Sequence, residues 1–205
     1  MISLSGSNVG KRFHRNWIFR GLAFAMASGS HSVLLGGNGS GKSTLLKILS
    51  GFSTPSEGKI TFELDGSEMD QLPTNTVSMA APYTSLYLQL TLEESIAYHL
   101  KFQSMLNNLS MEEIMEIAYL KEHRNKVIKN FSSGMLQRLK LSLAILSDTP
   151  LLLLDEPCSN LDEKAISWYK EMMHKYTDGR TVVIATNDVQ NDVLKSDVVI
   201  NLQAS

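Results

Sequence analysis

The sequence predicts an α/β fold with a mainly parallel sheet, and three observations lead to this expectation. Short, continuously apolar runs alternate with segments of helical periodicity. A glycine-rich loop stands between one apolar run and a helical segment, which is the strand-loop-helix setting of a phosphate-binding loop. Another apolar run ends abruptly in two carboxylates. Continuous apolar strands separated by helices are typical of a parallel sheet that is covered on both faces.

The N-terminal half supplies the first expected elements in order. Residues 1–35 are rich in strand-forming runs, with a turn at 28–30. The helix after the glycine-rich loop leads through a proline-containing connection at 51–58 to a strand at 59–64. Asp-Gly at 65–66 predicts a tight turn after that strand.

A helical block and a second α/β portion follow. Thr91 and Glu94 form a capping box that starts the block, and residues 111–119 carry apolar side chains at helical spacing. After Pro150 the alternating pattern returns. We expect strands at 151–154, 182–185 and 198–202 and a helix at 163–175.

Length and composition limit the classes of protein that fit. The 205 residues suffice for one compact domain with a substantial core. A net charge of -2 gives no sign of the basic surface that nucleic acids require, so nucleic acid is not an expected partner. The single Cys158 cannot form an internal disulfide, which fits a reducing compartment. Without a secretory signal or a long apolar span, we expect a cytosolic chain that can dock on a membrane partner.

The glycine-rich loop runs from Gly36 to Thr44 and reads Gly-Gly-Asn-Gly-Ser-Gly-Lys-Ser-Thr. Glycines permit positive φ and close backbone approach, so successive N–H groups can converge on phosphate oxygens. We expect Lys42 to reach the β and γ phosphates and the Ser43 hydroxyl to ligate Mg²⁺. A chance match to this pattern in a chain of this length has a probability of roughly 1%. The expected phosphate-binding residues are Gly36, Asn38, Gly39, Ser40, Gly41, Lys42, Ser43 and Thr44.

The apolar run at 151–154 delivers Asp155 and Glu156 to the sheet edge, where ligands of open α/β folds bind. We expect Asp155 to hold Mg²⁺ through water, and Glu156 to act as general base or to orient water at the γ phosphate. Asp-Glu-Pro is also a common turn string, so this interpretation depends on the phosphate loop that precedes it.

A third motif, Phe131-Ser132-Ser133-Gly134-Met135, precedes an apolar helical segment. Hydroxyls and a glycine at a helix start can bind an anion. Taken alone, the pattern is better explained by an ordinary capped core helix. The order of the motifs along the chain reverses that preference.

Together the motifs resemble those of the nucleotide-binding subunits of ABC transporters, over nearly the entire chain. The family's LSGGQ signature corresponds to residues 131–135 and its SALD loop to residues 159–162. The resemblance implies one ABC ATPase domain over residues 1–205, built on a P-loop NTPase core with an N-terminal antiparallel β portion. It also implies an α-helical subdomain insertion at about 91–130, between the core segments 1–90 and 131–205.

The resemblance further implies how such a chain works. Two chains, expected to be a homodimer, pair head to tail around ATP and Mg²⁺. ATP then lies between the phosphate loop of one chain and Ser132 and Gly134 of the other, and Ser133 and Asp162 are further expected nucleotide-binding residues. Hydrolysis drives a transmembrane permease subunit, to which the chain is attached on the cytoplasmic face of the membrane. The Ser-Ser-Gly-Met form of the signature and the short helical block are similar to those of compact exporter ATPases.

One further position carries over from the family. Phe13 stands where the family places an aromatic side chain that stacks on adenine, and Trp17 is the competing choice.

Two positions depart from the family pattern. Pro82 stands where relatives carry a glutamine that contacts Mg²⁺ and the attacking water, and Asn187 stands where relatives carry a histidine that contacts the γ phosphate. Asn187 can donate a hydrogen bond but cannot titrate. We expect slow hydrolysis, because phosphoryl transfer depends mainly on positioning and charge stabilisation, and Lys42, Asp155 and Glu156 remain.

Two alternatives stay open at this point. One is a soluble ABC ATPase that moves no solute, as in iron-sulfur assembly. The other is a slow, regulatory nucleotide-binding module, which the losses at positions 82 and 187 favour.

Overall fold

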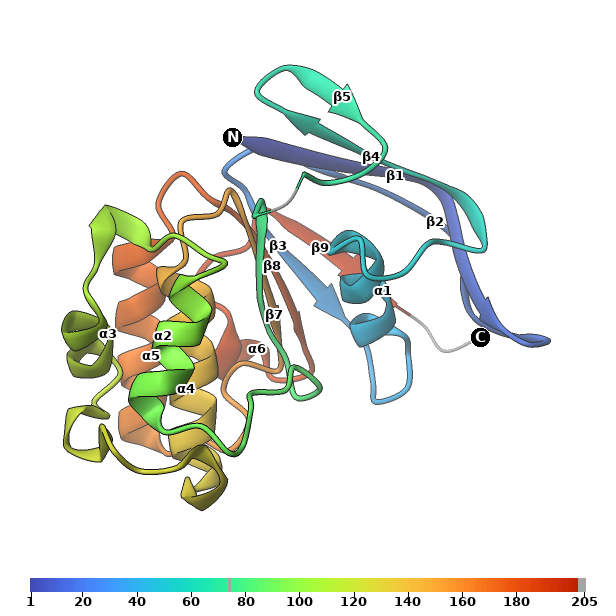
Figure 1. The fold of residues 1–205 in the computed structure, drawn as a ribbon. Helices are drawn as coiled ribbons and strands as arrows, with labels where there is room; N and C mark the ends of the chain where they lie inside the picture. The colour runs from blue at the N-terminus through green and yellow to red at the C-terminus, as the bar shows by residue number, and fades with distance from the viewer. Residues whose placement is uncertain (74, 203–205) are drawn as a thin grey trace.

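The computed structural model describes residues 1–73 and 75–202, which form two sheets and a set of helices (Figure 1). One sheet has four strands in the order β2-β1-β4-β5, and the other has five strands in the order β6-β7-β8-β3-β9. Every pairing in the first sheet is antiparallel, and every pairing in the second is parallel. The expected α/β class with a mainly parallel sheet is therefore confirmed.

The antiparallel sheet is built from the N-terminal segments. β1 (Ile2–Phe13) pairs with β2 (Asn16–Met26) on one side and with β4 (Glu57–Leu64) on the other, and β4 continues into β5 (Ser67–Met69). The turn at 65–66 has φ values of 49° and 83°. Positive φ at both central residues matches the right-handed twist of a two-residue hairpin, which explains the Asp-Gly pair.

The parallel sheet places the carboxyl ends of its strands at one edge, because all five run the same way. Its central strands are buried along their whole length, as continuous apolar runs require. The strands of this sheet are β3 (His31–Leu35), β6 (Val77–Ala80), β7 (Leu151–Asp155), β8 (Thr181–Thr186) and β9 (Val198–Asn201). β7, β8 and β9 start and end within one residue of the predicted strands, whereas β6 was not predicted.

Helices cover both faces of the parallel sheet. α1 (Lys42–Leu49) lies between the two sheets, where its leucines join a core with β1, β7 and β8 (Figure 1). α4 (Ser133–Leu146) and α5 (Glu163–Tyr176) pack on the opposite face in a second core. A short helix, α6 (Val189–Asp192), follows β8.

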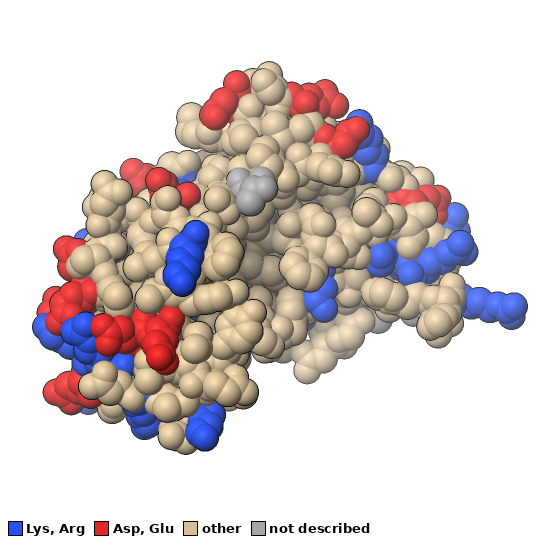
Figure 2. All heavy atoms as spheres, in the orientation of Figure 1, with Lys and Arg blue, Asp and Glu red and all other residues tan. Residues whose placement is uncertain are grey.

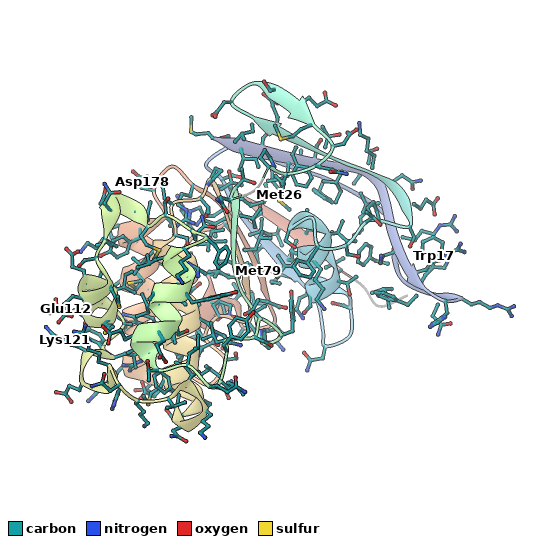
Figure 3. All side chains as sticks on the ribbon, viewed as in Figure 1. Trp17, Met26, Met79, Glu112, Lys121 and Asp178 are labelled. Atoms are coloured by element: carbon teal, nitrogen blue, oxygen red, sulfur yellow. The ribbon has the colours of Figure 1, made fainter. Side chains whose placement is uncertain are left out.

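The segment at 91–130 is less continuously helical than the sequence suggested. It holds α2 (Leu92–Leu100) and α3 (Met111–Ile117), each opened by a capping box, of which the one at Thr91 and Glu94 was predicted. The 3₁₀ turn η1 (Leu106–Asn108) lies between these helices, and two more, η2 (Lys121–His123) and η3 (Ile128–Asn130), follow α3. Figure 3 shows Glu112 and Lys121 together on the outer face of this block, at the opposite side of the molecule from Trp17.

Surface charge differs between the two ends of the molecule. Charges of both signs cover the helical side, whereas blue side chains gather at the far end of the β1–β2 hairpin (Figure 2). The hairpin sequence carries Lys11, Arg12, Arg15 and Arg20. Arg20 is paired with Glu57. Among the described residues, no helix has the length and apolar character needed to cross a membrane.

Candidate functional site

The phosphate loop lies at the carboxyl end of β3 and opens α1. Gly41 has φ 99°, and a Cβ there would stand 2.6 Å from Ile18 Cγ2, so only glycine fits. The helix starts at this glycine without any side-chain cap. Its first N–H groups therefore remain available to an anion, as helix N-termini that bind phosphate require.

Lys42 is buried within this loop, with an exposed fraction of 6%. Its Nζ donates to the carbonyls of Gly36 (2.6 Å) and Gly37 (3.3 Å) and lies 3.6 Å from Glu156 Oε1. These contacts hold the ammonium group in the lining of a hollow of about 440 Å³. The hollow is lined by Ile18, Gly37, Asn38, Gly39, Ser40, Gly41, Lys42, Ser43, Thr44, Pro82, Tyr83, Asp155 and Glu156.

Asp155 ends β7 inside this hollow and is almost fully buried. Neither of its carboxylate oxygens accepts a hydrogen bond at ordinary distance from the described part of the chain. Burial raises the pKa of Asp155, while the Ser43 hydroxyl and the ammonium groups of Lys42 and Lys47 lower it. A buried carboxylate without a donor is costly unless a cation or water meets it.

The residues around Asp155 fit Mg²⁺, which prefers oxygen ligands and keeps several waters. The Ser43 hydroxyl and the Asp155 carboxylate are the protein oxygens that could hold it. No cluster of three or more His, Cys, Asp or Glu side chains suited to a metal occurs among residues 1–73 and 75–202. A cation here would therefore depend on phosphate oxygens and water to complete its octahedral shell.

Glu156 follows directly and has the left-handed φ of 48°, unusual for a residue with a side chain. Its N–H donates to the Ala185 carbonyl (2.8 Å), which fixes this conformation. Burial raises the pKa of Glu156, and Lys42 opposes that change, whereas Asp192 adds to it. A carboxylate with raised proton affinity in a phosphate site suits a general base.

Asn187 joins the same edge from the end of β8. Its Nδ2 donates to Asn38 Oδ1 (3.2 Å), so the position next to β8 reaches the phosphate loop. The parallel strands β3, β7 and β8 thus bring Lys42, Glu156 and Asn187 to one edge of the sheet.

The sequence interpretation missed Asp192, which ties two site loops together from α6. Its carboxylate accepts from the Cys158 N–H (2.8 Å) and from the Thr186 hydroxyl, and its backbone carbonyl accepts from the Tyr169 hydroxyl (2.8 Å). The residue is 1% exposed, and burial raises the pKa of Asp192. The loop after Glu156 and the loop with Asn187 are therefore held in a fixed relation. No spacing in the sequence signals such a contact.

Tyr83 was also missed. Pro82 and Tyr83 both line the phosphate-loop hollow, and the Tyr83 hydroxyl donates to the Ser43 carbonyl (3.4 Å). Lys47 Nζ stands 4.1 Å from the centre of the Tyr83 ring. Burial and the neighbouring Asp155 raise the pKa of Tyr83, so its hydroxyl keeps its proton.

The serine-glycine motif lies in a second hollow, of about 270 Å³. Ser132 caps α4 by accepting from the Met135 N–H (3.2 Å), and Asp162 caps α5 by accepting from the Ala165 N–H (2.8 Å). Ser133 is the first residue of α4. None of the described residues that line this hollow also lines the first one. The lining residues are Ser132, Gly134, Met135, Arg138, Asn160, Leu161, Asp162 and Ala165.

α4 also contacts the first hollow from its middle. The Gln137 amide donates to the Pro157 carbonyl (2.7 Å) inside the protein, next to the loop that carries Glu156. Lys140 Nζ donates to the carbonyls of Ala81 and Pro82, at 3.2 Å each. One helix therefore starts at the second hollow and braces the walls of the first.

The two candidates for an adenine contact lie on the β1–β2 hairpin, outside the lining of the first hollow. Phe13 is 52% exposed at the end of β1. Trp17 lies beneath the guanidinium groups of Arg12 (5.7 Å) and Arg20 (4.6 Å). Ile18 is the hairpin residue that lines the hollow. An aromatic contact from Phe13 or Trp17 therefore stays a prediction.

Comparison with known proteins places these motifs in context. The family model described as ABC transporter matches residues 19–159. A probable sulfate/thiosulfate import ATP-binding protein CysA from Chlorella vulgaris is 31% identical, covering 91% of this chain and 81% of that protein. The spermidine/putrescine import ATP-binding protein PotA from Protochlamydia amoebophila (strain UWE25) is 31% identical, with coverage of 93% and 52%.

Export and structural relatives complete the comparison. A Nod factor export ATP-binding protein I from Rhizobium johnstonii is 29% identical, with coverage of 91% of this chain and 61% of that protein. The chain thus spans from 52% to 81% of the length of these three relatives. A bacterial Atm1-family ABC exporter with ATP bound has the same fold, with a TM-score of 0.82 at 24% identity over 98% of this chain and 37% of that one.

Proposed function

The chain belongs to the ABC transporter family as an ATP-binding subunit with ATPase activity, and we propose that it works as a head-to-tail dimer that drives a separate transmembrane subunit. ATP and Mg²⁺ occupy the phosphate-loop hollow, and the serine-glycine hollow of a second copy closes over the γ phosphate. The segment 91–130 is the helical subdomain that contacts the membrane partner, within a single ATPase domain. The chain acts on the cytoplasmic face of the membrane.

The separation of the two hollows carries this proposal. Ser132, Gly134 and Asp162 line one hollow, and the charged residues of the phosphate site line the other. Each hollow is open, and each lacks what the other offers. Two copies related by a twofold axis can bring both together, because such an interface uses the same two patches of each subunit reciprocally.

The residues of the phosphate site divide the chemistry among them. Lys42 exchanges its carbonyl partners for phosphate oxygens, and the uncapped N–H groups of α1 bind the same anion. Ser43 and Asp155 hold Mg²⁺, which when bound neutralises charge on the phosphates. Glu156 accepts the proton of the attacking water, and Asn187 donates a hydrogen bond toward the γ phosphate.

We propose export as the direction of transport, which the compact helical block supports. The relatives include both import and export proteins. Pro82 and Asn187 favour a second candidate, a slow regulatory nucleotide-binding module, since both remove side chains that assist hydrolysis in relatives. A soluble, assembly-type ATPase is the third, and co-purification with a protein of several membrane spans distinguishes transport from it.

ATP hydrolysis by the purified chain tests the proposal. We expect Mg²⁺-dependent turnover that rises more than linearly with protein concentration, because a site forms only in the dimer. Lys42→Ala should abolish nucleotide binding and turnover while leaving the melting temperature close to that of the parent. Turnover strictly proportional to protein concentration over a range in which the chain stays monomeric would contradict the shared site. Tight ATP binding without turnover, also in the presence of a co-purified membrane partner, would support the regulatory module instead.

A further inference from the structure

The turn after β6 carries a side chain that the proposed function does not yet use. Residues 81–84 form a compact turn in which the Ala81 carbonyl accepts from both the N–H (3.1 Å) and the hydroxyl (2.7 Å) of Thr84. The turn presents Pro82 and Tyr83 to the phosphate-loop hollow. Pro82 has no polar side-chain atom, and the Thr84 hydroxyl is bonded within the turn, so among the turn residues that line the hollow Tyr83 carries the polar side-chain atom.

The Tyr83 ring is held in a defined place. Lys47 Nζ lies 4.1 Å from the ring centre, close enough for a cation–π contact. Lys47 and Ser43 are four residues apart on α1, so they lie on one face of that helix. The ring therefore runs along the face of α1 that presents Ser43, and its hydroxyl reaches the Ser43 backbone at 3.4 Å.

Lys140 fixes the turn from the other side. It reaches across from α4 and donates to the carbonyls of Ala81 and Pro82, the two residues immediately before Tyr83. Burial lowers the pKa of Lys140, as expected for an ammonium group placed among backbone carbonyls. By holding these two carbonyls, Lys140 restricts the orientation of the Tyr83 side chain.

Asp155 offers the Tyr83 hydroxyl a second acceptor besides the Ser43 carbonyl, which lies at the long distance of 3.4 Å. Both oxygens of this buried carboxylate are without an ordinary hydrogen bond from the described residues. The phenol and the carboxylate line the same hollow as Ser43. A hydroxyl that keeps its proton can donate to a carboxylate or to water bound beside it.

We propose that Tyr83 is a positioning residue of the metal site, whose hydroxyl orients the Asp155 carboxylate and the water around the Mg²⁺ that this site is proposed to hold. Lys140 holds Tyr83 in place through the backbone of the turn. Tyr83 thereby supplies, one residue later, the side-chain oxygen that Pro82 cannot. This inference rests on the proposed function, because it concerns the same metal and nucleotide.

Manganese binding tests it without relying on turnover. The full chain is titrated with Mn²⁺ in the presence of ADP, and bound Mn²⁺ is followed by electron paramagnetic resonance. Tyr83→Phe keeps the ring over Lys47 and removes only the hydroxyl. We expect the Kd for Mn²⁺ to rise about tenfold, the effect of one hydrogen bond to a charged group. The Kd for ADP measured in EDTA should change less than about twofold, since phosphate contacts are untouched.

Two other variants serve as control and second test. Tyr87→Phe removes a hydroxyl that contacts Tyr98 on the surface, outside the hollow, and should bind Mn²⁺ like the parent. Lys140→Met removes the ammonium group and retains an apolar stem. It should weaken Mn²⁺ binding in the parent but add little in the Tyr83→Phe background, because it acts through Tyr83.

The possible outcomes separate this inference from the proposed function. Unchanged Mn²⁺ affinity in Tyr83→Phe overturns the role of the hydroxyl, while Mn²⁺ and ADP binding by the parent leaves the proposed function standing. An equal loss of ADP affinity in EDTA also overturns it, because the hydroxyl would then support the hollow as a whole. A parent chain that binds neither ADP nor Mn²⁺ contradicts the proposed function itself, and the inference falls with it.

Discussion

The two hollows of this chain lie at the N-termini of helices that differ in their capping. α1 starts at Gly41 without a side-chain cap, whereas α4 and α5 start with the side chains of Ser132 and Asp162 already bonded to their first turns. The first hollow also contains a buried carboxylate and a buried ammonium group, while the second offers caps and Arg138. The first hollow is therefore equipped to bind a phosphate, and in the proposed dimer the second hollow would complete the site of the other copy.

The largest expected effect concerns the chemistry of the first hollow. Glu156→Gln keeps the size of the side chain and removes the base, so kcat should fall by at least about a hundredfold, as loss of general base catalysis predicts. ATP binding should persist, because Lys42 and the N–H groups of α1 remain. Size-exclusion chromatography in saturating Mg²⁺-ATP should then show a trapped dimer. A monomer under these conditions would contradict the shared-site proposal.

Mixing two inactive variants sharpens the comparison between the hollows. Gly134→Asp places a negative charge in the second hollow, where a Cβ added to the glycine would have no contact closer than 3.4 Å, so the fold should be retained. This variant should still bind ATP but lose more than about tenfold in turnover, because like charges oppose closure over the phosphates. Lys42→Ala has an intact second hollow. Together they should regain activity, because a mixed dimer contains one complete site.

The control is each variant alone at the same total protein concentration as the mixture, and each should stay inactive. Complementation that fails while both variants bind the parent chain would show that the two hollows do not meet across a dimer.

The smallest expected effects are on stability. Asp192→Ala leaves the Cys158 N–H and the Thr186 hydroxyl without their acceptor in the interior, and should lower the free energy of unfolding by about 2 kcal/mol. Ser132→Ala removes an exposed cap and should cost about 1 kcal/mol. Urea denaturation measures both. The reverse order would show that the Ser132 cap contributes more to stability than the contacts of Asp192.

Local and repeated patterns made much of the fold predictable. Apolar runs of four residues located β7 and β8, and the capping box at Thr91 located the start of α2. The continuity of the helical block was not predictable in this way. Asn107 and Asn108, which lie between α2 and α3, both have a φ of 53°, so the helical conformation cannot continue through this segment. Asparagine adopts this left-handed conformation more often than most residues but does not require it, so its presence does not predict the break.

The site was predictable where its residues belong to one motif and unpredictable where they meet from distant segments. Lys42, Ser43, Asp155 and Glu156 stand in recognisable strings, and parallel strands bring them to one edge. Lys140 contacts the turn at 81–82 from 58 positions or more away in the sequence, and Asp192 contacts Cys158 across 34. Such contacts depend on how elements pack, which a single sequence does not encode as a spacing.

The contacts of α4 with the first hollow affect which amino-acid substitutions the chain can tolerate. Gln137 and Lys140 donate to backbone carbonyls at positions 157, 81 and 82, atoms that every amino acid possesses. Substitutions at those three positions therefore leave the acceptors in place. The side chains that the loops display can therefore change while the hydrogen bonds that hold the loops in place persist.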